Sequence, residues 1–234
     1  MLRVAVAGVH GRMGRLAAQT VGAAADLEVV GGFARNADPE RHIYSDFTAL
    51  LHAAKPDVVV DFTTHPITVD IAHACIVHGV SPVIGSSAWT PQERDELAAV
   101  ARAHLIGSML VPNFAVGAVL LMQFAQHAAR FFPSVEIVEM HRAEKLDKPS
   151  GTARALAERI GAVTHADVPI HSVRLHGVLA HHEAIFGNTG ETFALRHDSL
   201  TSESFAQGIL LAVRAVRSYK ELVVGIDALV EAVR

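Results

Sequence analysis

Apolar residues in the first 112 positions form short continuous runs, separated by longer segments in which apolar positions recur with helical spacing. Continuous runs predict strands that are covered on both faces, and the segments between them predict helices. The expected strands cover residues 2–7, 27–33, 56–62, 81–84 and 105–111. Since strand and helix alternate, we expect an α/β unit with a Rossmann-type parallel sheet, whose ligands lie at the carboxyl ends of the strands.

The pattern changes after residue 117 to that of an α+β half. We expect a long apolar helix, a strand, a helix, three strand-like runs and an amphipathic helix, over residues 118–131, 135–138, 153–160, 170–175, 180–186, 191–196 and 204–216. These strands predict an open mixed sheet with an edge or face suited to subunit contacts. The expected domains are a dinucleotide-binding domain over 1–112, completed by 206–234, and a substrate-binding and oligomerisation domain over 113–205.

A glycine-rich turn follows the first predicted strand directly and precedes a helical pattern that runs to about residue 24. Strand, glycine turn and helix in this order are typical of a dinucleotide cradle, in which the backbone approaches the pyrophosphate. The spacing G-x-x-G-x-x-G departs from the general fingerprint, and a turn that only packs the helix on the strand is the alternative. The candidate cofactor residues are Gly8, Val9, His10, Gly11, Arg12 and Met13.

The second predicted strand ends in Ala34 and Arg35. An acidic residue at this place would bind both ribose hydroxyls and favour NAD, whereas an arginine can receive a 2′-phosphate. Because the acid is missing, we expect NADPH as the cofactor, with NADH still accepted. The alternative is that Arg35 is a solvated loop charge.

A charged segment from Glu139 to Thr152 joins a predicted strand to a predicted helix. Pro149 prevents an earlier helix start, and Ser150 is a good N-cap. The first free N–H groups of that helix, together with its dipole, suit a carboxylate or phosphate. His141 adds a group that exchanges protons near neutral pH, and Lys145 adds a fixed positive charge. A salt-bridged surface loop ahead of an ordinary helix is the alternative.

The spacing Glu139-x-His141-x-x-x-Lys145-x-Asp147-x-Pro149-Ser150-Gly151-Thr152 closely resembles the signature of the dihydrodipicolinate reductase family. The resemblance implies that His141 is the proton donor to the substrate and that Lys145 assists this transfer. It also implies that Gly151 and Thr152 hold a substrate carboxylate; we expect the substrate carboxylates at the helix start of Ser150, Gly151 and Thr152 and against Lys145 or Arg142. The glycine turn, preceded by Ala7, is similar to the same turn in that family. The resemblance further places the cofactor along Gly85, Ser86, Ser87, Val111, Pro112, Asn113 and Phe114.

Three departures from the family pattern stand out. Arg142 occupies the place of a second histidine, and it can hold a carboxylate but cannot mimic a neutral imidazole. Ser202 stands where the family has an arginine, so Arg142 is a candidate to replace the lost charge. The stretch between residues 161 and 173 is shorter than is usual in the family.

Composition excludes several other classes of function. The 234 residues are 50% hydrophobic and carry a formal net charge of -4 without a block of like charges, which argues against nucleic acid or an anionic membrane as partner. The single cysteine, Cys75, fits a reducing cytoplasm, and no stretch reaches the length of a membrane span. A metal site is not expected, because the histidines at 171, 176, 181 and 182 share no common face; surface or edge-strand histidines are expected instead.

The resemblance therefore implies an NAD(P)H-dependent reductase of a small cyclic dicarboxylate in lysine and diaminopimelate biosynthesis, assembled as a homotetramer. Two alternatives remain. One is a paralogue that reduces a different imine or keto dicarboxylate, as Arg142 and Ser202 suggest. The other is a non-catalytic NADPH-binding protein built on the same fold.

Overall fold

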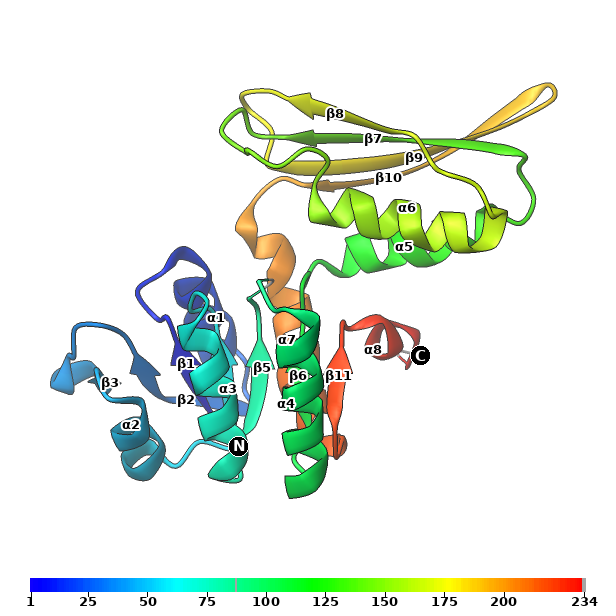
Figure 1. Cartoon of the computed structure of the whole chain (residues 1–234). Helices are drawn as coiled ribbons and strands as arrows, with labels where there is room; N and C mark the ends of the chain where they lie inside the picture. The colour runs from blue at the N-terminus through cyan, green and yellow to red at the C-terminus, as the bar shows by residue number, and fades with distance from the viewer. Residues whose placement is uncertain (87, 233–234) are drawn as a thin grey trace. The chain divides into compact units, whose positions relative to one another are not determined.

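The computed structural model describes residues 1–86 and 88–232, and the predicted cofactor residue Ser87 lies outside this range. The chain divides into two units, which are described separately below (Figure 1). The first unit comprises Met1–Phe114 together with the segment that starts at Phe205, and the second unit comprises Ala115–Ser204.

The first unit contains a parallel sheet of seven strands in the order β11-β6-β5-β4-β1-β2-β3. The strands are β1 Leu2–Ala7, β2 Leu27–Phe33, β3 Ile43–Tyr44, β4 Val58–Asp61, β5 Ser81–Ile84, β6 Ser108–Leu110 and β11 Leu222–Val224. The longer helices are α1 Arg12–Gly22, α2 Phe47–Ala54, α3 Ile67–Val77, α4 Pro91–His104, α7 Ala206–Ala215 and α8 Asp227–Ala232. Short 3-10 turns η1 Pro39–Arg41 and η3 Val216–Ser218 complete it.

The continuous apolar runs form the central strands of this sheet. Val4–Ala7 of β1 and Val58–Val60 of β4 are fully buried, because helices cover both faces of the sheet. Helix α1 packs with α7, whereas α3 packs with α2 and α4 (Figure 1). The order β3-β2-β1-β4-β5-β6 is that of a Rossmann sheet, so the predicted fold class is confirmed for this unit.

Among the strands and α-helices of the first unit, β3, β11, α2 and α8 were not predicted. Strand β3 has two residues and β11 has three, and α2 spans eight, so each is short for a periodicity argument. Strand β6 begins at Ser108 rather than at residue 105, because Leu105 has φ 55° and ends helix α4. The helix that precedes it starts as its sequence suggests, with Thr90 and Glu93 forming a capping box around Pro91.

The second unit contains a sheet of four strands in the order β10-β9-β7-β8. Its elements are α5 Val116–Ala128, β7 Ser134–His141, α6 Gly151–Thr164, β8 Ile170–Arg174, β9 Ala180–Asn188, β10 Glu191–Ser199 and, at its end, the 3-10 turn η2 Ser202–Phe205. Strands β7 and β8 are parallel, whereas β9 is antiparallel to β7 and β10, so the predicted open mixed sheet is confirmed. Helices α5 and α6 cover one face of this sheet (Figure 1).

Strand β7 continues to His141, three residues beyond its predicted end at residue 138. Ile137, Glu139 and His141 alternate onto the face that is turned toward the helices, and each is buried. The prediction of a strand end at residue 138 was wrong because two of these inward positions are polar and interrupt the apolar pattern. The core of the second unit therefore becomes polar at the end of β7.

Candidate active site

His141 ends β7 with only 8% of its surface exposed, and Glu139 precedes it on the same face of the strand with 0% exposed. The Nδ1 atom of His141 and the carboxylate of Glu139 form a short hydrogen bond. The histidine predicted to donate a proton is therefore already engaged through one ring nitrogen, which leaves the other nitrogen for a ligand.

Arg174, at the end of β8, holds the same carboxylate with two parallel hydrogen bonds. Its Nη2 lies 2.9 Å from Oε1 of Glu139, and its Nη1 lies 3.1 Å from Oε2. The guanidinium also donates to the carbonyl oxygens of Asp147, at 2.7 Å, and of Lys145, at 3.3 Å. Because one arginine bonds to the strand and to the loop, it fixes the charged loop against β7.

Lys145 lies within this loop, and its Nζ is 2.7 Å from Oδ1 of Asp147. The side chain of Lys145 is 24% exposed. The fold therefore brings the two predicted catalytic residues, His141 and Lys145, into one region, because both are connected to Arg174 through its contacts with Glu139 and with the loop.

A second histidine, His182 of β9, packs against His141. The two ring centroids are 5.2 Å apart and the rings are nearly perpendicular, at 77°. The Nε2 of His182 is 3.2 Å from Oγ of Ser150, which in turn accepts a hydrogen bond from the backbone N–H of Ala153. The predicted N-cap at Ser150 is thus confirmed, and the buried histidine supports it.

The other residues predicted to bind substrate lie around the start of α6 and in the loop. Gly151 and Arg142 are exposed, and Thr152 is half-buried. A Cβ atom on Gly151 would meet only Nη2 of Arg154, at 4.0 Å, so no close neighbour crowds this position at the start of α6. This arrangement can receive an anion, because the first N–H groups of a helix carry partial positive charge.

Burial and charge set the protonation of this cluster. Burial alone would raise the pKa of Glu139, but hydrogen bonds from Arg174, Ser172 and His141 outweigh it and lower that pKa to about 2. Burial lowers the pKa of His141, while Glu139 opposes this effect. Burial also lowers the pKa of His182 to about 4, so this ring is neutral near pH 7.

The low pKa of His182 predicts a pH-dependent stability. Its folded pKa of about 4 lies below the ordinary 6.5, so the unfolded chain takes up a proton first as the pH falls. Stability is fully present above about pH 6.5 and is lost progressively toward about pH 4. Replacing His182 by Gln, which keeps a donor for Ser150, is expected to reduce the loss between about pH 7 and pH 4.5 by about 2 kcal/mol.

Urea unfolding at the two pH values measures this difference. The matched control is His176→Gln, because the side chain of His176 is 87% exposed. An equal loss of stability in wild type and in His182→Gln would contradict the prediction.

The turns predicted to hold the cofactor lie side by side at the carboxyl ends of the strands in the first unit's sheet. The register pairs Ala7 with Phe33 and with Asp61, Asp61 with Ile84, and Ile84 with Leu110. The strands therefore end on one line, and the turns that follow them are neighbours. These turns contain the predicted residues Gly8 to Met13, Ala34, Arg35, Gly85, Ser86 and Val111 to Phe114.

The glycine turn has the backbone geometry of a cradle. Gly8 has φ 76°, and its carbonyl accepts the N–H of Gly11 at 2.9 Å. A Cβ atom on Gly14 would lie 2.1 Å from the carbonyl oxygen of Gly8, so only glycine fits there. No side chain among the described residues caps helix α1 at Gly11, which leaves its opening amides for an anion.

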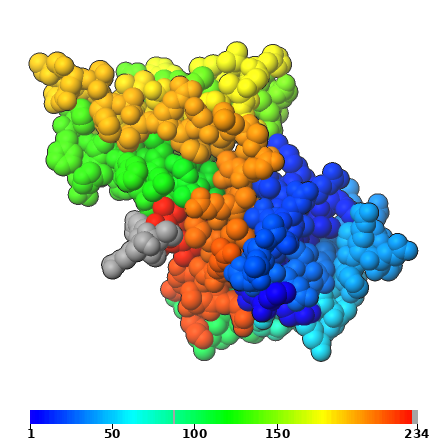
Figure 2. Space-filling view, turned by 180° about the vertical axis from the view of Figure 1, so that it is seen from behind, coloured from blue at the N-terminus to red at the C-terminus, as the bar shows by residue number. Residues whose placement is uncertain are grey.

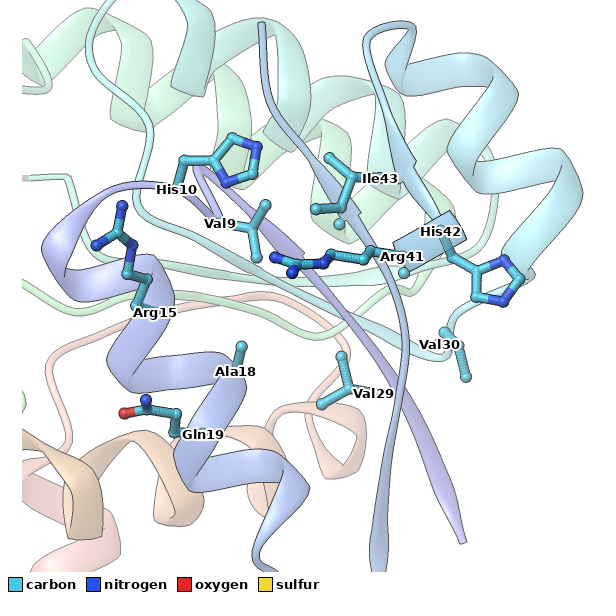
Figure 3. Close-up of a pocket in the computed structure, with 12 residues that line it drawn as sticks. Val9, His10, Arg15, Ala18, Gln19, Val29, Val30, Arg41, His42 and Ile43 are labelled. Atoms are coloured by element: carbon cyan, nitrogen blue, oxygen red, sulfur yellow. The ribbon is translucent and has the colours of Figure 1, made fainter. Parts of the chain in front are cut away.

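A pocket of about 360 Å³ lies beside this turn, between α1, β2 and the segment that enters β3 (Figure 3). Val9 and His10 line it, and Arg41 extends across it toward Val9. Arg15 of α1 also lines the pocket, whereas the predicted Arg35 is exposed and is not among its lining residues. Arg15 and Arg41 are therefore further cations near the predicted ribose position.

Sequence reasoning missed three side chains of the site. Glu139 belonged to the recognised motif but received no role, and Arg174 and His182 were not candidates. The expectation that the histidines of β9 lie at the surface was wrong for His181, which is 8% exposed, and for His182, which is 4% exposed. The alternation of His182 with Ala184 and Phe186, both apolar and buried, was the signal that could have placed it inward. Among the described residues, no group of three or more candidate ligands could hold a metal ion.

A Rossmann sheet with a glycine turn at its switch point, together with a buried histidine that a carboxylate orients, defines an NAD(P)H-dependent oxidoreductase. The chain belongs to the dihydrodipicolinate reductase family, as its sequence motifs predicted. Residues 2–114 match the family described as dihydrodipicolinate reductase, N-terminus, and residues 117–230 match dihydrodipicolinate reductase, C-terminus.

Several relatives are similar over nearly the whole chain. The 4-hydroxy-tetrahydrodipicolinate reductase of Enterococcus faecalis is 40% identical over an alignment 256 residues long, which covers 97% of this chain and 99% of the relative. The reductase of the same name from Listeria monocytogenes is 38% identical, and the alignment covers 98% of this chain and 100% of the relative. The solved structure of dipicolinate-bound dihydrodipicolinate reductase from Paenisporosarcina sp. TG-14 is 34% identical with a TM-score of 0.89, covering 97% of this chain and 99% of that one.

More distant structures share the fold alone. The amine dehydrogenase of Mycobacterium smegmatis has a TM-score of 0.66 at 14% identity and covers 97% of this chain and 95% of its own. Within the part of the chain that the structure describes, no helix has both the length and the apolar character that a bilayer crossing requires.

Proposed function

We propose that this chain is a 4-hydroxy-tetrahydrodipicolinate reductase, which uses NAD(P)H to reduce a cyclic unsaturated dicarboxylate to tetrahydrodipicolinate. One observation carries the proposal. A buried histidine, engaged through Nδ1 by Glu139, ends β7 in the same unit as the start of α6, which Ser150 caps and where Gly151 has no side chain. Two of the most similar relatives bear this name, and the similar solved structure holds dipicolinate, which is itself a cyclic dicarboxylate.

In this proposal the substrate-binding and catalytic residues of the second unit have the following roles. The amides of Gly151 and Thr152 receive a substrate carboxylate, and Ser150 fixes the helix start that presents them. Lys145 places a positive charge beside the ring and assists the proton transfer, and Arg142 is exposed in the same loop for the second carboxylate. His141 gives the proton from Nε2 to the ring carbon, because Glu139 occupies Nδ1.

The first unit is proposed to hold the dinucleotide. Its cradle suits the pyrophosphate, because Gly14 lets α1 start against the backbone of Gly8 and no side chain at Gly11 caps the opening amides of the helix. NAD(P)H supplies the hydride when it is bound there. Ala34 brings no carboxylate, and Arg35 with the pocket cations Arg15 and Arg41 favours a 2′-phosphate, so NADPH is the proposed preference.

The test is a coupled assay in which the dihydrodipicolinate precursor is generated enzymatically and the oxidation of NADPH and NADH is followed side by side. The expected result is turnover with both nucleotides and a higher kcat/KM with NADPH. Tight NADPH binding without consumption would support the non-catalytic alternative. Turnover only with another imine or keto dicarboxylate would support the paralogue. The exposed Arg142, which departs from the family pattern, is the structural feature that suggests this alternative.

The second unit is also the proposed site of assembly into a homotetramer. Helices α5 and α6 cover one face of its sheet, and the opposite face carries apolar side chains such as Val173 and Ile185, 37% and 36% exposed. The hairpin of β9 and β10, yellow to orange in Figure 2, lies at the surface. Light scattering of the purified protein measures the assembly, and a monomer would contradict it. A cytoplasmic location is proposed from the single buried Cys75, and cell fractionation tests it.

A further inference from the structure

Glu139 and Arg174 form a buried ion pair behind His141. Glu139 is 0% exposed and the side chain of Arg174 is 7% exposed, so both charges have left water. A buried ion pair of this kind often stabilises a protein less than apolar residues of similar volume would. The inward position two residues before Glu139 is the apolar Ile137, which shows that the same strand face accepts an apolar side chain.

We propose that Glu139 and Arg174 are positioning residues that set the tautomer and the proton affinity of His141. The inference rests on the proposed role of His141 as the acid. The Glu139 carboxylate accepts the Nδ1–H of His141, so a proton that the ring gives to substrate leaves from Nε2. After the transfer the neutral ring keeps its Nδ1–H and its bond to Glu139, and a proton from solvent restores Nε2–H.

Three charged side chains act on the protonation of His141, and the ring of His182 packs against it. Glu139, on the same strand, favours the protonated ring, whereas Lys145 of the loop and Arg174 of β8 disfavour it. His182 of β9 faces the ring but is neutral near pH 7, and its own further neighbours are His181 and His197. Arg174 therefore acts in two ways: it holds Glu139 in its anionic, oriented form, and its charge limits how strongly that anion raises the pKa of His141.

This arrangement predicts shifts of opposite sign. Glu139→Gln removes the anion, so the pKa of His141 is expected to fall by about one unit. Arg174→Gln removes a nearby cation, while Glu139 keeps its contacts with His141 and Ser172, so the pKa of His141 is expected to rise by about one unit. If Glu139 and Arg174 had a purely structural role, the two variants would not shift the pKa of His141 in opposite directions.

The pKa is measured in the unliganded protein by NMR titration of the histidine ring signals, with the His141 signal assigned from His141→Asn. The pH profile of kcat/KM gives the second readout. Its basic limb is expected to move to lower pH in Glu139→Gln and to higher pH in Arg174→Gln, because the free enzyme's acid sets that limb. At neutral pH, Glu139→Gln is expected to lose about tenfold in kcat with KM nearly unchanged.

The chain offers a matched control on the same strand. Glu136 pairs with His171 at 2.7 Å, but both side chains are more than half exposed, and Glu136→Gln is expected to leave the pKa of His141 and the rate unchanged. Should Glu139→Gln fail to fold because Arg174 is left unpaired, the double variant Glu139→Gln/Arg174→Gln carries the test. In the double variant the pKa of His141 is expected to be lower than it is in the single variant Arg174→Gln.

Shifts in the same direction for both variants, no shift in either, or a double variant equal to Arg174→Gln would overturn the inference. Failure of the proposed function looks different. In that case the titration of the unliganded protein shows the expected shifts while the wild type does not turn over the precursor, so the coupling stands and the reductase proposal falls.

Discussion

Replacing His141 by Asn is expected to lower kcat about 100- to 1,000-fold while KM for the dicarboxylate changes less than about threefold, because a positioned acid acts mainly in the transition state. The fold is expected to persist, since Arg174 still holds Glu139 with both hydrogen bonds. Steady-state kinetics with saturating NADPH measure the loss. NADPH binding, followed by nucleotide fluorescence, is expected to stay unchanged, which separates lost chemistry from lost binding.

The matched control for this variant is His171→Asn. His171 lies on the neighbouring strand β8, but its side chain is 56% exposed and pairs with Glu136. The control is expected to keep the wild-type rate. A His141→Asn enzyme that turns over as fast as wild type would remove His141 from the mechanism, whatever the substrate.

Replacing Gly14 by Ala is expected to be the most damaging change in the first unit. The new Cβ would lie 2.1 Å from the carbonyl oxygen of Gly8 and 2.9 Å from Cα of Val9, and both are backbone atoms that move only with the turn. The expected cost is about 2–4 kcal/mol of unfolding free energy. NADPH affinity is expected to fall at least about tenfold, because the displaced turn no longer offers its amides in the right place.

The same helix provides the control. A Cβ atom on Gly22 would meet only Cγ2 of Val29, at 3.9 Å, which is ordinary van der Waals contact. Gly22→Ala is therefore expected to leave NADPH binding intact and to stabilise the helix by up to about 1 kcal/mol. Denaturant unfolding and fluorescence titration of both variants give the two quantities. Equal stability and affinity for Gly14→Ala and Gly22→Ala would show that the turn is not a tight cradle.

The strand-and-turn organisation of the first unit was predictable because each signal there is local. Val4–Ala7 and Val58–Val60 are continuous apolar runs, and Gly14 is needed because a Cβ atom there would meet the backbone of Gly8, six residues earlier. Strands β3 and β11 were not predictable, because two or three residues carry no measurable period. The place of β11 at one edge of the sheet also depends on β6, a partner far away in the chain.

The site was predictable only in part, for a related reason. The motif from His141 to Thr152 lies within one short segment, so its residues and the N-cap at Ser150 could be recognised together. Glu139 was part of the recognised motif, but its role depends on Arg174 of β8, which is 35 residues away in the chain. His182 is 32 residues from Ser150 and was taken for a surface histidine.

The sequence by itself determined the family, the Rossmann-type and open mixed sheets, the glycine turn and the segment that bears His141 and Lys145, because apolar period, glycine spacing and helix caps are properties of neighbouring residues. Only the tertiary structure decided which charges are buried together. Pairing β7 with β8 and β9 placed Arg174 and His182 beside Glu139 and His141. The protonation of the histidine depends on that pairing, since burial and opposing charges act through space and not along the chain.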